Sequence, residues 1–117
     1  IAWLRSGETK IVEKTPKDFG LRKAKAEEIA GTTPEESAAI TFNILNGLSG
    51  QDAKKDIVIV NAAAGIIVGG KADDFEEGLE QAHESIENGQ AYEKLRMLVK
   101  KSGGDLSNIE ELESKYL

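Results

Sequence analysis

Residues 56–70, DIVIVNAAAGIIVGG, decide which fold class the chain belongs to. The first part, IVIV at 57–60, has the composition of a buried strand, and the small residues after it suit a helix. The whole run is also long enough to be one buried helix, with Asp56 as a good helix cap. Periodicity cannot separate these two interpretations, because the run is apolar on every side apart from Asn61.

A helix precedes this stretch. Thr33 can cap it, Pro34 stands where a missing N–H costs nothing, and Glu36 completes a capping box. We expect the helix to run from Pro34 to about Asn46, since apolar residues recur along one face at spacings of three and four.

Three more helices are expected downstream. Asp73 and Glu76 repeat the capping pattern before an amphipathic helix. Residues 90–101 form the next one, with two lysines favourably placed in its last turn. A final helix opens at Ser107, within the tail 102–117.

The N-terminal residues 1–15 predict a β-hairpin, because a Ser6-Gly7 turn separates two short arms. Pro16 then opens a single helical turn that ends at Gly20. The segment is therefore expected to be mostly α-helical with an N-terminal β-hairpin.

Composition limits the possible functions. The 117 residues suffice for one domain or part of one. With no cysteine and one histidine, the chain has no disulfide framework, no thiolate nucleophile and too few ligands for zinc. Residues 26–117 carry a net charge of −10, from eight Lys/Arg against eighteen Asp/Glu. We expect a cytoplasmic protein with no nucleic-acid or membrane partner.

The glycines of residues 64–70 suggest a phosphate loop, but their spacing matches neither the dinucleotide fingerprint nor the Walker pattern. Gly65 and Gly69 are instead expected to allow close helix packing, with a helix stop at Gly69-Gly70.

Other polar residues form no catalytic constellation. His83 is expected at the surface, the acids of residues 73–77 suit the positive end of a helix, and the cations of residues 22–25 suit a solvated face. Asn61 is expected to be buried and to bridge a helix end or a neighbouring loop. We predict no catalytic, cofactor-binding or metal-binding residue in this chain.

Four stretches share their order and spacing with one enzyme family: TPKDFGL at 15–21, EIAGTTPEESA at 28–38, ILNG at 44–47 and KDIVIVNAAA at 55–64. Together they resemble the C-terminal portion of anthranilate phosphoribosyltransferases. The likeness extends to about Val99, and the tail after Gly103 has no counterpart that we can place. The Asn-Ala-Ala helix alone would also suit pyrimidine nucleoside phosphorylases.

The resemblance implies an α/β parent fold in which a small helical domain joins a larger α/β domain. Residues 1–101 would be the C-terminal part of the larger domain, with the hairpin at 1–15 and helices at 34–101, and residues 102–117 a tail helix. It also makes residues 57–69 a helix.

The implied activity is transfer of a phosphoribosyl group from phosphoribosyl pyrophosphate to anthranilate in tryptophan biosynthesis. The resemblance further implies Mg²⁺ on the pyrophosphate and a homodimeric parent.

The family's glycine-rich loop, metal-binding Asp-Glu pair and anthranilate-contacting arginine all match positions upstream of Ile1. We therefore expect a C-terminal fragment that is inactive alone and whose partner is the missing N-terminal part of the same chain. Part of a pyrimidine nucleoside phosphorylase and a stand-alone helical interaction module are the alternatives. A stand-alone module predicts cooperative unfolding, whereas a fragment predicts exposed apolar surface and marginal stability.

Overall fold

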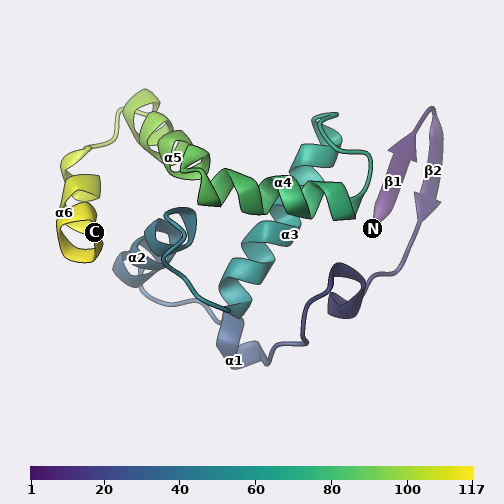
Figure 1. Cartoon of the computed structure of the whole chain (residues 1–117), viewed down its shortest axis with the longest axis horizontal. Coiled ribbons are helices and arrows are strands. Elements are labelled where there is room, and N and C mark those ends of the chain that lie inside the picture. Colours follow the sequence, from purple (N-terminus) through teal and green to yellow (C-terminus); the bar gives the residue numbers. More distant parts are fainter.

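The computed structural model describes all 117 residues as a two-stranded hairpin followed by helices (Figure 1). The elements in chain order are β1 (Ala2–Arg5), β2 (Glu8–Ile11), the 3-10 helix η1 (Pro16–Phe19), α1 (Ala26–Ile29), α2 (Pro34–Leu45), α3 (Ala53–Val68), α4 (Phe75–Glu87), α5 (Gln90–Lys101) and α6 (Ser107–Tyr116). The predicted class, a mostly helical segment with an N-terminal hairpin, is confirmed. None of the helices is both long and apolar enough to cross a lipid bilayer.

The hairpin is antiparallel, with Trp3 opposite Lys10. Its turn places Ser6 at φ 51° and Gly7 at φ 78°. Two consecutive residues with positive φ make the turn type whose twist matches that of paired strands, so the predicted Ser6-Gly7 connection is confirmed.

Residues 53–68 form one continuous helix, α3, so the strand interpretation of residues 57–60 is wrong. The cap is Asp52, whose side chain accepts a hydrogen bond from the Lys54 N–H at 2.9 Å, and not Asp56. Gly70, at φ 73°, ends the helix as expected. A helix with apolar residues on every side has no period that sequence patterning could detect.

Helix α2 begins where the cap predicts. The Thr33 hydroxyl accepts a hydrogen bond from the Glu36 N–H at 3.2 Å, and Pro34 occupies the first turn. The Glu36 carboxylate does not bond back to Thr33, so only half of the expected capping box is present.

The cap of α4 differs by one residue from the prediction, whereas α6 begins where it was predicted. Asp74, not Asp73, caps α4 by accepting from the Glu77 N–H at 2.9 Å. Helix α6 begins at Ser107 as predicted, and the Asp105 carboxylate before it accepts a hydrogen bond from the Ser107 N–H at 2.9 Å.

The core lies where α2, α3 and α4 meet. Ile44, Ile59, Ala82 and Ile86 are buried together there, and α4 crosses α3 closely (Figure 1). The expected close packing at Gly65 and Gly69 is wrong: a Cβ at Gly65 would meet nothing within 4 Å, and one at Gly69 only its own helix. The glycine at the crossing is Gly78 of α4.

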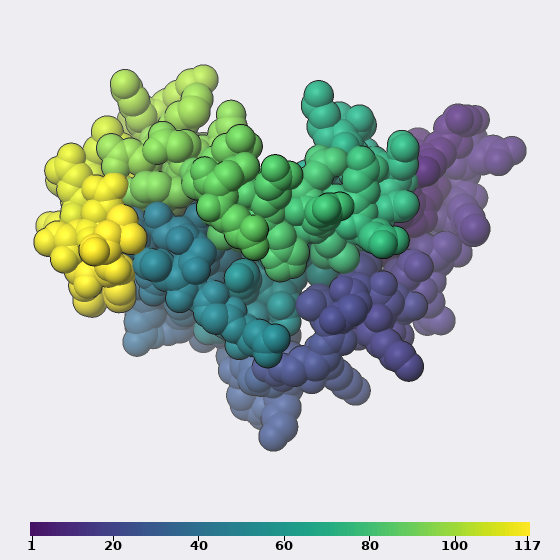
Figure 2. Space-filling view, viewed as in Figure 1, coloured from purple at the N-terminus to yellow at the C-terminus, as the bar shows by residue number.

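The chain is less compact than a globular domain of the same length. Only 11 of 117 residues are buried. The Cα radius of gyration is 15.9 Å, whereas a compact domain of this size has about 13 Å. Figure 2 shows the hairpin projecting at one end of the molecule and α6 forming the other. Large apolar side chains are consequently exposed on several elements.

Candidate functional site

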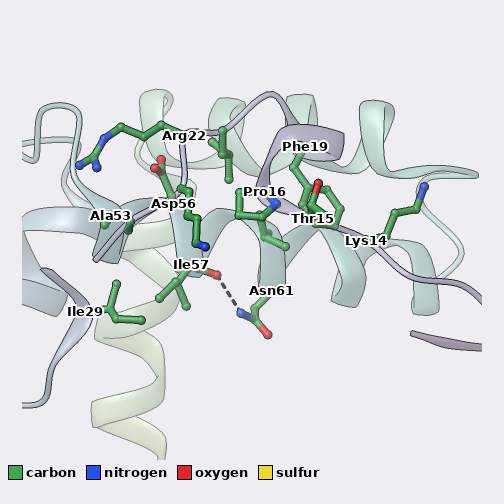
Figure 3. Close-up of a pocket in the computed structure, with 14 residues that line it drawn as sticks. Lys14, Thr15, Pro16, Phe19, Arg22, Ile29, Ala53, Asp56, Ile57 and Asn61 are labelled. Atoms are coloured by element: carbon green, nitrogen blue, oxygen red, sulfur yellow. Dashed lines mark hydrogen bonds between the residues drawn. The ribbon is translucent and has the colours of Figure 1, made fainter. Parts of the chain in front are cut away.

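One hollow lies between the segment of residues 14–24, α1 and α3 (Figure 3). Its volume is about 420 Å³. Its apolar lining consists of Pro16, Phe19, Leu21, Ala24, Ile29, Ala53, Ile57 and Val60, and its polar lining of Lys14, Thr15, Arg22, Lys23, Asp56 and Asn61. We call this hollow the α3 groove.

Arg22 is the cation of the α3 groove with a fixed partner. Its guanidinium lies 2.6 Å from the Glu28 carboxylate, which also accepts a hydrogen bond from the Lys25 N–H at 2.7 Å. The bond from Arg22, and next the bond from Lys25, lower the pKa of Glu28 to about 2. The positive charge of Arg22 is therefore largely neutralised by Glu28 at the start of α1, which weakens its attraction for an external anion.

Thr15 supplies the only hydroxyl group in the α3 groove. Its N–H and its hydroxyl both donate to the Asp18 carboxylate, at 2.6 and 2.8 Å. These bonds lower the pKa of Asp18, first through the Thr15 N–H and then through its hydroxyl. A carboxylate with a lowered pKa is a weak general base, so this pair is a cap for η1 and not an activated nucleophile.

Asn61 is exposed, which corrects the expectation that it is buried and bridging. Its amide donates to the Ile57 carbonyl oxygen one turn earlier in the same helix, at 2.8 Å (Figure 3). Together with Lys14, Phe19 and Val60 it is shared between the α3 groove and a neighbouring hollow of about 460 Å³.

The other candidate residues lie apart from the α3 groove. His83 is exposed on α4, as expected. Asp74 caps that helix, and the Asp73 N–H donates to the Glu77 carboxylate at 2.9 Å. No three carboxylate or imidazole side chains come together as ligands anywhere in the chain.

A polar cluster that was not predicted from the sequence lies between α5 and α6. The Tyr92 hydroxyl donates to Glu113 Oε1, which also accepts from Arg96 Nη1 at 2.5 Å. Burial, and next the bond to Glu113, raise the pKa of Tyr92. Tyr92 and Arg96 share a helix face at a spacing of four, but no local pattern identifies Glu113 as their partner.

These features define a mostly helical segment with an N-terminal hairpin and a largely apolar groove beside α3. Comparison with known proteins identifies the family of the chain. The family model described as "Glycosyl transferase family, a/b domain" matches residues 1–92. The chain belongs to this glycosyl transferase family.

Several curated relatives carry the same name. An anthranilate phosphoribosyltransferase of Methanobrevibacter smithii is 41% identical over 96 residues, which are 82% of this chain and 28% of the relative. One of Pelotomaculum thermopropionicum is 45% identical over 100 residues, covering 86% of this chain and 28% of the relative. One of Petrotoga mobilis is 37% identical over 115 residues, covering 98% and 31%.

The chain thus spans 28 to 31% of the length of these relatives. The Petrotoga match covers so much of the chain that it includes most of the tail, which corrects the expectation that the residues after Gly103 lack a counterpart. No solved structure matches the chain significantly.

Proposed function

We propose that the chain is the C-terminal part of an anthranilate phosphoribosyltransferase. The parent enzyme transfers a phosphoribosyl group from phosphoribosyl pyrophosphate to anthranilate, in tryptophan biosynthesis and in the cytoplasm. The observation that carries this proposal is the 45% identity over 100 residues to a relative of that name. The parent is proposed to be a homodimer that uses Mg²⁺.

Within that enzyme this segment is a scaffold. Some of its charged groups order the local structure: Arg22 pairs with Glu28, and Asp18 accepts hydrogen bonds from Thr15 at the start of η1. We place reaction chemistry and metal binding in the remaining part of the parent. This is supported by the lack of any group of three or more carboxylate or imidazole side chains that could hold a metal ion here. The 117 residues alone are therefore inactive.

The test is an assay of the full-length parent with anthranilate, phosphoribosyl pyrophosphate and Mg²⁺, beside the 117-residue chain at equal concentration. Turnover by the parent and none by the chain supports the proposal. Turnover of pyrimidine nucleosides with phosphate, and none of anthranilate, would assign the parent to the nucleoside phosphorylases instead. Activity of the chain alone would contradict the scaffold role.

A further inference from the structure

Helix α3 contains no charged residue from Ile57 to its end at Val68, whereas the exposed face of α4 carries several glutamates. A helix without charge on any side is normally enclosed by protein on all sides. Here α4 covers one side of α3, through Ile59, Ala63 and Ile67, which are buried. The sequence of α3 therefore indicates a second covered side that the 117 residues do not supply.

The uncovered side is continuous. At 100° per residue, its exposed positions fall within one arc of about 140°; they are Ile57, Val58, Asn61, Ala62, Gly65 and Val68. We call them the open face of α3. Val68 is 88% exposed, Ile57 44% and Val58 36%. The only polar side chain of the open face, Asn61, has its amide bonded to its own helix.

The family match indicates what covers this face. An α/β domain is a layered structure in which helices cover a β-sheet. Residues 1–92 match an a/b domain, yet they contain only two strands of four residues each, paired with one another. The main sheet of that domain therefore belongs to the remaining 70% or so of the parent, since the chain spans 28 to 31% of its relatives.

The sheets of such domains present apolar residues on both faces because helices cover both. The open face of α3 has matching properties: it is uncharged and rich in β-branched residues, and Ala62 and Gly65 let a flat surface approach closely. We infer that the open face of α3 is the surface on which this segment docks against the main β-sheet of its own parent chain. This inference rests on the proposed function.

The experiment uses the full-length parent with single cysteines introduced by Ala62→Cys on the open face and Glu84→Cys on the charged face of α4. Both positions are exposed in this chain, which has no cysteine of its own. Maleimide labelling is followed by the mass of the peptide that carries each position. We expect position 62 to label about 100-fold more slowly than position 84 in the native parent, and equally fast in urea.

Equal labelling in the native parent would overturn the inference. Val68→Cys serves as a second probe if Ala62→Cys fails to fold. A photoreactive phenylalanine derivative at position 58 should crosslink to a strand of the same polypeptide. A crosslink to another subunit, or protection that disappears on dilution, would show that a second copy covers the face and would also overturn it. Labelling does not depend on turnover, so the absence of phosphoribosyl transfer would contradict the proposed function separately.

Discussion

A Cβ atom at Gly78 of α4 would lie 3.0 Å from the backbone oxygen of Ala63 in α3 and 3.2 Å from its Cβ. The absence of a side chain at position 78 is therefore what brings the two helices into direct contact. Because the facing atoms belong to the backbone and the Cβ of α3, they cannot rotate away as the end of a long side chain would.

Gly78→Leu should lower the free energy of unfolding by about 3 kcal/mol, since α4 must move away from α3 to admit the new side chain. Urea denaturation of both proteins measures this. Glu80→Leu, which puts the same side chain at an exposed position of the same helix, is the control and should change it by about 0.5 kcal/mol or less. Similar losses for both variants would contradict the close crossing.

Phe42 links three helices and is only 1% exposed. Its ring lies edge-on to Tyr92 of α5 at 5.6 Å and tilted against Tyr116 of α6 at 6.1 Å. Phe42→Ala should cost about 3–5 kcal/mol of stability through lost burial and the cavity left behind. Thermal and urea unfolding check this, with Ile11→Ala at an 80% exposed hairpin position as the control. A loss no larger than that of the control would mean that Phe42 is not part of a packed core.

Glu28 makes the stability of the fold depend on pH in the acid range. Its pKa is about 2 in the folded chain, against an ordinary 4.5. A carboxyl group whose pKa is lowered by folding stabilises the fold above its unfolded pKa, and this contribution is lost as the pH falls from 4.5 towards 2. An NMR titration of the Glu28 carboxyl should give a midpoint near 2 that Arg22→Gln moves upward. A midpoint near 4.5 in the unaltered chain would show that the Arg22 pair does not form.

Glu113 holds α6 against α5 through Tyr92 and Arg96. Glu113→Ala should speed hydrogen exchange of the α6 amides while leaving those of α3 unchanged, because the loss is local to the last helix. Tyr92→Phe keeps the Arg96 bond and should have a smaller effect. If Glu113→Ala leaves the exchange of α6 unchanged, its apolar contacts, such as buried Ile109, suffice to hold it.

The sequence predicts the helices with polar outer faces well, since regular apolar spacing identifies them and capping residues precede α2 and α4. Helices α2, α4 and α5 all form at their predicted places. Neighbouring cap candidates are harder to separate: Asp73 and Asp74 have the same chemistry, and only the path of the chain into α4 decides between them.

Two features could not be predicted from the residues alone: that residues 57–60 are helical and not a strand, and that the Asn61 side chain is exposed. An apolar run without charge has no period, and whether Asn61 is buried depends on what lies beside the helix. The contact of Gly78 with Ala63 is also non-local, because it requires the crossing of two helices. The pair of Arg22 with Glu28 could not be predicted either, because only the folded path of residues 22–28 brings the two side chains together.

The tether between the hairpin and α4 also bears on the order of assembly. Arg5 donates to the Asp73 carbonyl oxygen at 2.7 Å across 68 positions of the chain, and the Trp3 ring lies 5.8 Å from that of Phe75. The contacts between α3 and α4 span far shorter loops, and local contacts form first. Residues 2–11 therefore leave the ribosome before Asp73 and Phe75 do, so the hairpin can dock only after α4 has been synthesised.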